Sequence, residues 1–254
     1  MDETLASGLI ELAMNTPVAK GAKGHDVRRI QEWLTLNGCG TGIDGDYGPG
    51  TAMAVRRFQE KCGLTVSGVV DTPTWSKLVE PLARVLVPLP FAPSTSLATA
   101  VSAVAHQHLA VHPVEAGGDN MGPWVRLYMR GKQGKAQLWC AGFVSFVIAQ
   151  AAAWLKQDLP FAGTFSCDQL ATFAKQTGRF VPDSAMSDIG NFGIGIFLVR
   201  ASKTDWVHTG FVISGGDQAF KSIEGNTNDD GNRNGFEVCM RSRSVFSKDF
   251  IRLS

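Results

Sequence analysis

Apolar residues recur at helical spacing through residues 137–154, QLWCAGFVSFVIAQAAAW. Four of them share one helix face ahead of an alanine run: Phe143, Val144, Val147 and Ile148. This pattern predicts a helix that is buried on nearly every side, with Cys140 in its first turn. Unpaired backbone N–H groups at a helix start favour an anion and can lower the pKa of a thiol. Cys140 is therefore a candidate nucleophile, and a small apolar core residue is the alternative interpretation.

The first third of the chain contains an internal repeat of helical pattern. Residues 27–31 (VRRIQ) recur as residues 55–59 (VRRFQ), and each copy places apolar side chains on one helix face. We expect Asp26 to cap the first helix and Thr51 to cap the second. A third short helix is expected to open at Thr72. Three such helices form a compact unit of about 60 residues, near the lower size limit for independent folding.

Four prolines and a Ser/Thr cluster in residues 80–98 predict an ordered linker that is not helical throughout. Helices are expected at about 98–112 and 169–176. Five strand patterns follow, separated by short loops: Ile194–Arg200, Trp206–Ile213, Gln218–Glu224, Phe236–Arg241 and Phe250–Leu253. Helices followed by such strands predict an α+β fold with an antiparallel meander. The expected division is a three-helix domain with a short N-terminal extension (1–82), a linker (83–98) and an α+β domain (99–254).

Three side chains near the expected hairpin can assist a thiol. Strand alternation places His208 on one face with Gly210, which leaves a gap where a helix end could fit. Glu224 and Asn226 share a face of the next strand if the chain stays extended. A three-residue loop at 215–217, or a bulge, puts His208 and Glu224 on the same face. A two-residue loop without a bulge sends Glu224 to the other face.

The chain order is cysteine, histidine, then an acid or amide, which is the order of papain-like thiol hydrolases. In that chemistry the thiolate of Cys140 attacks an amide carbonyl, and His208 passes the proton to the leaving amine. Glu224 or Asn226 orients the imidazole ring. The backbone N–H of Cys140 is the expected oxyanion donor. Cys167 is expected to be dispensable.

Charge and hydropathy exclude several classes of partner. Lys and Arg number 24 against 23 Asp and Glu, so neither nucleic acid nor an anionic membrane is the expected partner. No apolar run approaches the length of a membrane span. The first 15 residues have an acidic start and no basic region before an apolar one, so no secretory signal is expected. We expect synthesis in the cytoplasm and another route to any other compartment.

Cysteine and histidine spacings bear on metal binding. Five cysteines are an odd number, which does not fit a disulfide scaffold, and no C-x-x-C pair is present for a structural zinc. Cys39 and Cys62 could approach each other, but spacing does not establish a bond. His108 and His112 have the i, i+4 spacing of a metal pair, with Glu115 as the nearest acidic residue. We expect neither a metal nor a cofactor.

Three motifs occur in order between residues 21 and 78: G-x-x-G-x-x-V-x-x-I-Q-x-x-L, I-D-G-D-Y-G-x-x-T-x-x-A-V-x-x-F-Q and S-G-V-V-D-x-x-T-W-x-x-L. Together they resemble the three-helix peptidoglycan-binding domain found on many cell-wall hydrolases. The resemblance implies that peptidoglycan is the partner of this part of the chain. A helical domain that binds something else is the alternative.

A second resemblance covers residues 100–254. The segments E-A-G-G-D-N-M-G-P-W-V-R-L-Y with W-C-A-G-F-V-S, H-T-G-F-V-I and I-E-G-N-T-N resemble motifs of CHAP domains, the cysteine- and histidine-dependent amidohydrolase/peptidases of bacterial wall hydrolases. The resemblance implies a papain-like α+β domain with Cys140 as nucleophile and His208 as base. It also implies Glu224 with Asn226 as the orienting pair.

Two segments of the chain bear on whether the protein binds calcium. The chain has Gly193-Ile194-Gly195-Ile196 where many CHAP domains carry Gly-Asp-Ile before the strand that precedes the histidine. The missing acid leaves a calcium-binding or loop-anchoring role of that position open. The oxygen-rich segment 226–232 lacks the twelfth-position glutamate of a calcium loop, and we expect it to be a turn beside the site.

The expected function is hydrolysis of an amide bond in the peptide part of the bacterial wall by a monomeric two-domain enzyme. Both an N-acetylmuramoyl-L-alanine amidase and an endopeptidase fit. So do two routes to the wall, as a phage endolysin or as an injected antibacterial effector, the second with an inhibitory immunity protein as partner. The alternatives are an inactive wall-binding protein, a phage structural protein that uses both domains for adhesion, and a thiol amidase or peptidase that acts on a non-wall substrate.

Overall fold

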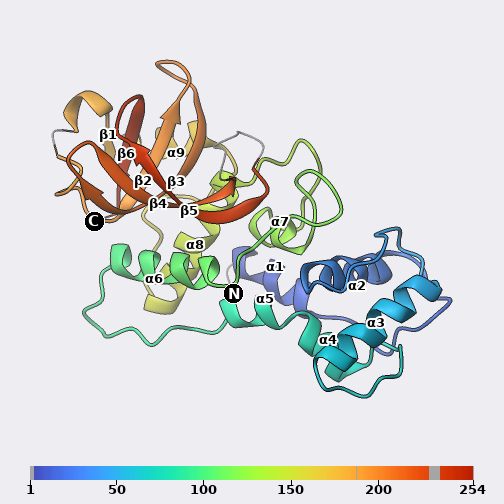
Figure 1. Cartoon of the computed structure of the whole chain (residues 1–254). Helices are drawn as coiled ribbons and strands as arrows, with labels where there is room; N and C mark the ends of the chain where they lie inside the picture. The colour runs from blue at the N-terminus through green and yellow to red at the C-terminus, as the bar shows by residue number, and fades with distance from the viewer. Residues whose placement is uncertain (1–2, 187, 229–234, 254) are drawn as a thin grey trace.

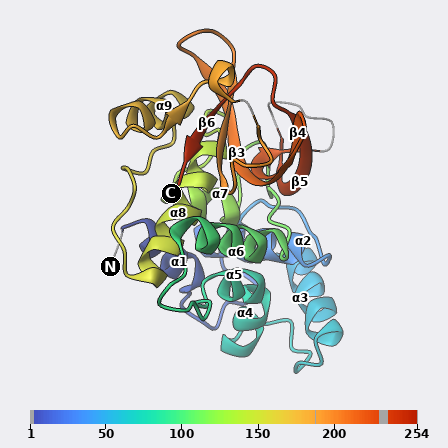
Figure 2. The same ribbon diagram turned by 90° about the vertical axis from the view of Figure 1, so that its left-hand side faces the viewer.

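The computed structural model describes residues 3–186, 188–228 and 235–253, so part of the expected turn at 226–232 lies outside the described residues. The described helices are α1 (Glu3–Leu12), α2 (His25–Leu36), α3 (Pro49–Lys61), α4 (Thr72–Leu78), α5 (Glu80–Val85), α6 (Leu97–Leu109), α7 (Pro123–Tyr128), α8 (Cys140–Leu155), α9 (Cys167–Gln176) and the 3-10 turn η1 (Asp183–Ala185). The strands are β1 (Phe180–Val181), β2 (Gly195–Arg200), β3 (Trp206–Gly216), β4 (Ala219–Thr227), β5 (Glu237–Ser244) and β6 (Lys248–Arg252). The predicted α+β class is confirmed. In Figures 1 and 2 the sheet occupies one end of the molecule, α6 and α8 lie beneath it, and α3 and α4 lie at the opposite end.

Helices α2, α3 and α4 form the expected three-helix unit, but the first two helices start differently from the prediction. Their N-caps are Gly24 and Gly48, so Asp26 and Thr51 lie inside the first turns of α2 and α3. Thr51 is buried, and its hydroxyl accepts a hydrogen bond from the amide of Gln31 at 3.1 Å. The predicted caps are wrong because tertiary contacts, not local capping, set these helix starts.

The internal repeat corresponds to two equivalent glutamine side chains. Gln31 accepts a hydrogen bond from the N–H of Gly45 at 2.8 Å and donates one to Thr51 at 3.1 Å. Gln59 accepts from the N–H of Gly68 at 2.9 Å and donates to a threonine hydroxyl of α4 at 3.0 Å. Both glycines have positive φ, 76° and 74°, which L side chains rarely adopt. Each glutamine thus joins the turn after its own helix to the first turn of the next helix.

The N-terminal helices and the α+β part share one continuous hydrophobic core. Trp33 of α2 packs edge-on against Trp124 of α7, with ring centroids 5.8 Å apart. Arg126 of α7 donates hydrogen bonds to Glu11 of α1 at 2.7 Å and to Glu32 of α2 at 2.8 Å. All three charged side chains are buried. Helix α1, which the sequence pattern does not predict, therefore joins the two halves of the chain.

The segment between α5 and α6 also lies against the protein. Leu86, Leu89 and Phe91 are partly buried and pack against the continuous core. Gln107 of α6 donates hydrogen bonds to the carbonyl oxygens of Arg84 and Val87 at 2.9 and 3.1 Å. None of the described helices is long and apolar enough to cross a membrane.

The sheet has the strand order β1-β6-β2-β3-β4-β5, and every neighbouring pair is antiparallel. Strands β2 to β5 form the predicted meander. Strand β6 then returns across the sheet to pair with β2, and the two-residue strand β1, which the sequence pattern does not predict, pairs with β6. The meander places β3 and β4 side by side in the middle of the sheet, next to α8.

The β3–β4 hairpin closes with a two-residue turn at 217–218, so the three-residue loop, one of the two arrangements expected, does not occur. The register then shifts at Ile213, which is the extra residue of a β-bulge. A bulge was the other arrangement that the sequence allowed. One bulged residue shifts the alternation of side chains by one position, as one extra loop residue would. His208 and Glu224 therefore still lie on the same face of the sheet.

Helix α8 is buried along its first three turns and part of the fourth, from residue 140 to residue 152. Phe143 packs edge-on against Phe211 of β3, with ring centroids 5.9 Å apart. Gly225 of β4 allows the start of the helix to approach the sheet, because a Cβ there would lie 2.7 Å from both Phe143 and Trp139. This packing fixes the position of Cys140, the first residue of the helix.

Candidate active site

Cys140 opens α8, and its side chain is only 5% exposed. The pKa of its thiol is held well below its usual range. The largest cause is the hydrogen bond with Cys167. Burial raises the pKa, while contact with His208 and the backbone N–H of Ala141 lowers it further. A sulfur with these neighbours favours the thiolate form.

His208 of β3 lies between the thiol and a carboxylate. Its Nε2 donates a hydrogen bond to Oε2 of Glu224 at 2.8 Å, which leaves Nδ1 for Cys140. Burial lowers the pKa of His208, but the contacts with Cys140 and Glu224 outweigh burial and raise the pKa to about 9. The two shifts have opposite directions, so both favour a thiolate beside an imidazolium.

Glu224 is fully buried and has several hydrogen-bond donors around it. Arg243 of β5 donates from Nε to Oε1 at 2.8 Å and from Nη2 to Oε2 at 2.6 Å. The hydroxyl of Ser222 donates to Oε1 at 2.5 Å. Burial raises the pKa of Glu224, but Arg243 and His208 together lower it to about 2. The carboxylate is therefore ionised and held in one orientation.

The sequence interpretation names neither Ser222 nor Arg243. Ser222 stands two residues before Glu224 on the same strand, so strand alternation was a usable signal. Arg243 lies on the next strand, and its contact depends on a register in which Glu224 pairs with Cys239. A carboxylate expected inside a sheet requires a partner, and the basic residues at alternate positions of β5 were the available candidates.

The gap at Gly210 has a different occupant from the one expected. A Cβ on Gly210 would lie 2.8 Å from Cγ of Glu224 and 2.9 Å from the ring of Phe197. The expectation that a helix end fills this gap is wrong. The space is needed by the carboxylate, which crosses it to reach His208, and α8 instead approaches the sheet at Gly225.

Asn226 lies against the start of α8 and not against the imidazole. Its side-chain oxygen accepts a hydrogen bond from the backbone N–H of Trp139 at 3.2 Å, and its amide donates to the carbonyl of Gly235 at 2.5 Å. Asn226 has a positive φ of 53°, so the strand does not stay extended there. The turn takes its side chain away from the contact that Glu224 makes with His208.

Trp139, the residue before Cys140, is held from three directions. Its indole N–H donates a hydrogen bond to Glu115 at 2.8 Å. Its ring stacks on Tyr128, with centroids 5.5 Å apart and an interplanar angle of 15°. Its backbone N–H is bound by Asn226. These contacts fix where α8 begins and thus where the thiol stands.

A second thiol lies beside the first. Cys167 opens α9, and its Sγ is 3.9 Å from Sγ of Cys140, although the two residues are 27 positions apart. Cys167 is 8% exposed. No local pattern brings the starts of two helices together, so this contact could not be expected from the sequence.

The two histidines with metal-pair spacing, His108 in α6 and His112 after its end, have other partners. His108 is fully buried between the hydroxyl of Tyr128 and the side-chain oxygen of Gln150, each at 2.9 Å, and burial lowers its pKa to about 4. His112 bonds to Glu237 at 2.5 Å. The two histidines thus do not converge on one point. In the described part of the chain, no group of three His, Cys, Asp or Glu side chains is arranged to hold a metal ion.

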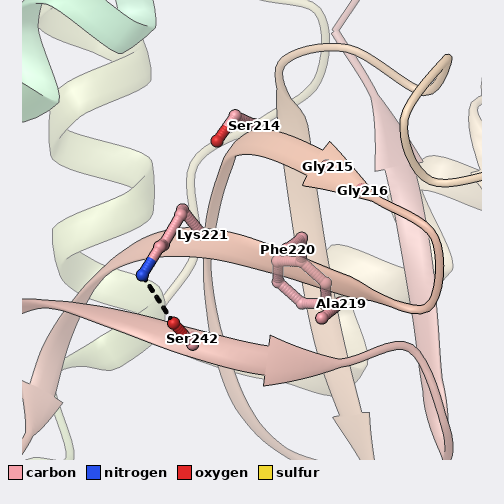
Figure 3. Close-up of a pocket in the computed structure, with 7 residues that line it drawn as sticks. All are labelled: Ser214, Gly215, Gly216, Ala219, Phe220, Lys221 and Ser242. Atoms are coloured by element: carbon pink, nitrogen blue, oxygen red, sulfur yellow. Dashed lines mark hydrogen bonds between the residues drawn. The ribbon is translucent and has the colours of Figure 1, made fainter.

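A hollow of about 230 Å³ lies at the far end of the β3–β4 hairpin (Figure 3). Its lining residues are Ser214, Gly215, Gly216, Ala219, Phe220, Lys221 and Ser242. Figure 3 shows Lys221 directed toward Ser242, to which it donates a hydrogen bond at 2.8 Å. The lining includes no member of the Cys140 site, so this hollow is separate from the candidate chemistry.

Comparison with known proteins identifies the N-terminal helices. Residues 23–78 match the family described as "Putative peptidoglycan binding domain". The chain therefore carries a peptidoglycan-binding domain near its N-terminus, as the sequence motifs indicated. This domain comprises α2, α3 and α4.

Relatives and solved structures match over a similar length. The spore cortex-lytic enzyme of Bacillus cereus is 43% identical over 72 residues, which are 28% of each protein. The zinc D-Ala-D-Ala carboxypeptidase of Streptomyces albus G is 37% identical over 68 residues, 25% of this chain and 26% of that protein. The crystal structure of the SleB N-terminal domain is 43% identical, covering 27% of this chain and 96% of that one, with a TM-score of 0.26. The chain thus spans about a quarter of the length of the curated relatives it matches.

Proposed function

We propose that this chain is a peptidoglycan hydrolase. Residues 1–82 bind the wall, and residues 99–254 cleave an amide bond of the wall peptide with Cys140 as nucleophile. The observation that carries the proposal is the chain of contacts from Cys140 through His208 to Glu224, in a protein with a peptidoglycan-binding domain. A thiolate, an imidazolium and an ionised carboxylate in this order are the groups that amide hydrolysis by a thiol requires.

In the first half of the reaction, the thiolate of Cys140 attacks the carbonyl carbon of the amide. The developing oxyanion faces the backbone N–H of Cys140, which has no intrahelical acceptor because it belongs to the first residue of α8. His208 donates its proton to the departing amine nitrogen, and the C–N bond breaks. A thioester on Cys140 and a free amine result.

In the second half, neutral His208 takes a proton from a water molecule as that water attacks the thioester. The carboxylic acid product leaves, and Cys140 returns to the thiolate form. Glu224 stays ionised throughout because its pKa is about 2, so it stabilises each imidazolium state of the ring. Arg243 and Ser222 act as positioning residues, because they hold the carboxylate and touch no reacting atom.

The proposed substrates are the bond between muramic acid and L-alanine and the peptide bonds of the stem or cross-bridge. Each releases an amine, so the same thiol machinery serves both. The enzyme acts at the wall after release through a lysed membrane or after injection. An immunity protein that blocks the Cys140 site is the expected partner of an injected enzyme.

The test is digestion of purified peptidoglycan by the reduced protein, with Cys140→Ala as the control. We expect released amines from the unchanged protein and none from the variant, while both sediment with insoluble wall. Mass spectrometry of the products distinguishes the bonds. Free stem peptides without muramic acid indicate an amidase, whereas shortened muropeptides with new amino termini indicate an endopeptidase.

Two results contradict the proposal. Sedimentation with the wall but no released amine identifies a wall-binding protein without this activity. Cleavage of a non-wall peptide amide, with no release from peptidoglycan, identifies a thiol hydrolase of another substrate class.

A further inference from the structure

We propose that Cys140 and Cys167 form a reversible disulfide when the protein meets hydrogen peroxide, and that this bond switches the site off. The pair is then an oxidation site in addition to a nucleophile and its neighbour. The effect on activity rests on the proposed function. The disulfide itself does not, because it depends only on the two sulfurs.

The geometry requires a small movement. The sulfurs are 3.9 Å apart, and a disulfide of about 2.05 Å requires them to approach by about 1.9 Å. Cys140 has little freedom, because Trp139 and the buried α8 hold it in place. Cys167 is the first residue of α9 and follows the non-helical residues 157–166. Residues 157–159, 162 and 163 of this segment are exposed, and Thr164 is hydrogen-bonded to Ser145 of α8. We therefore assign the movement to the start of α9.

The lowered pKa of its thiol makes Cys140 the sulfur that reacts first with peroxide. A thiolate attacks peroxide far faster than a thiol, and the pKa of Cys140 is held well below its usual range. The largest cause is the hydrogen bond with Cys167, so the second sulfur is already in contact with the one that is oxidised. A low-pKa cysteine next to a resolving cysteine is the arrangement that reversible thiol oxidation requires.

The chemistry proceeds in two steps. The Cys140 thiolate attacks one oxygen of hydrogen peroxide, an S–O bond forms, the O–O bond breaks, and the leaving hydroxide takes a proton from His208 to become water. The Cys167 sulfur then gives up its proton and attacks the sulfenic sulfur of Cys140. An S–S bond forms, the S–O bond breaks, and the hydroxide leaves with that proton as a second water. Two thiols and one peroxide thus give one disulfide and two waters.

Two consequences follow for the thiol. A Cys140 sulfur inside a disulfide is neutral and bonded to a second sulfur, so it cannot attack an amide as a thiolate does. Activity therefore stops until a thiol reductant cleaves the bond. Without Cys167, the sulfenic acid continues to the sulfinic acid, which thiol reductants do not reverse. Cys167 therefore makes the oxidation of Cys140 recoverable.

The test uses the full chain, reduced, freed of reductant and treated with a small excess of hydrogen peroxide. Remaining thiols are blocked with N-ethylmaleimide, and the protein is digested without reductant for mass spectrometry. We expect a Cys140 peptide joined to a Cys167 peptide, together with loss of wall cleavage. Dithiothreitol is expected to separate the peptides and restore the activity.

The matched variants are Cys167→Ser and Cys62→Ser, each compared with its own reduced state. Cys167→Ser should give sulfinic Cys140 and no recovery with dithiothreitol, whereas Cys62→Ser should behave like the unchanged protein. Sulfinic Cys140 beside an alkylated Cys167 in the unchanged protein overturns the proposal without use of any variant. A joined peptide in a protein that cleaves no wall upholds the disulfide and contradicts the proposed function, so the two fail separately.

Discussion

Arg243 donates two parallel hydrogen bonds to Glu224, at 2.8 and 2.6 Å, from a strand that neighbours the one carrying the carboxylate. Of the influences that lower the pKa of Glu224 the contact with Arg243 is the largest, although burial acts more strongly in the opposite direction. The arginine thus keeps the carboxylate both ionised and oriented, and its Nη2 bonds to the same oxygen, Oε2, as Nε2 of His208.

We expect Arg243→Met to lower kcat on wall substrate by roughly ten- to a hundredfold, since small misplacements of a catalytic group have effects of that size. The pKa of Glu224 should rise without the cation, so the acidic limb of the pH–rate profile should move to higher pH. Arg243→Lys keeps a charge but not the two-pronged geometry. It should restore the acidic limb while kcat stays low.

The control for this pair is Arg252→Met, because Arg252 packs over Phe192 away from the site. It should leave the profile unchanged. Equal kcat for Arg243→Met and the unchanged protein would show that Ser222 and His208 suffice to hold the carboxylate.

Cys140→Ala and Cys140→Ser should each abolish cleavage, by about 10⁴-fold or more, because the members of a catalytic unit fail together. The measurement is release of amines from purified wall. Circular dichroism and thermal unfolding should show an intact fold, and Cys62→Ser should retain activity. Near-normal rates in either Cys140 variant would exclude the thiol mechanism.

Glu224→Gln and Asn226→Ala should differ in their pH–rate profiles. Glu224 raises the pKa of His208, which is about 9, so its loss should lower that pKa. The basic limb should therefore move to lower pH by about one unit or more. Asn226→Ala should reduce the rate without moving this limb, because Asn226 contacts Trp139 and not the ring. A basic limb that moves only in Asn226→Ala would reverse these two roles.

Arg126→Met should destabilise the whole protein. The substitution removes the cation that hydrogen-bonds both Glu11 and Glu32 and leaves each buried carboxylate only a longer contact, with Arg29 at 3.7 Å and with Arg28 at 3.5 Å. This is expected to lower the free energy of unfolding by about 3 kcal/mol. Chemical denaturation measures the change, and Arg57→Met on the exposed face of α3 is the control.

A triple variant, Glu11→Gln with Glu32→Gln and Arg126→Met, should recover much of this loss, because no buried charge then lacks a partner. A loss below about 1 kcal/mol in Arg126→Met alone would mean that water reaches the two carboxylates.

Local patterns predicted those elements that bury a face of their own. Helix α8 starts three residues after the expected position, and strand β3 continues three residues beyond Ile213. The added residues 214–216 are exposed serine and glycine, so no alternation marks them. Helix α1 was not predicted because its role depends on Arg126, 115 positions from Glu11. Spacing within a short segment contains no information about such a partner.

The residues of the candidate site also separate into those that local patterns predict and those that only tertiary contacts bring together. The types and order of Cys140, His208 and Glu224 were enough to name them as candidates from the sequence. Strand parity left the face of Glu224 open, and the bulge at Ile213 is what brings it to the face of His208. Cys167 and Arg243 lie next to the same atoms but were not selected. Their contacts arise from the meeting of two helix starts and from a strand register, which no local pattern specifies. Their roles in catalysis and oxidation remain predictions.

The packed connection between α5 and α6 and the buried Arg126 cluster join the peptidoglycan-binding domain firmly to the part of the chain that carries Cys140. An enzyme on a loose tether can reach many bonds around one anchoring point, whereas the proposed hydrolase, held in this way, should reach only those at a single offset and angle. Once these bonds are cut, the binding domain has to dissociate from the wall before the next bond can be cut. We therefore expect the turnover of the proposed hydrolase on intact wall to be limited by the dissociation rate of the binding domain, so that tighter binding slows cleavage.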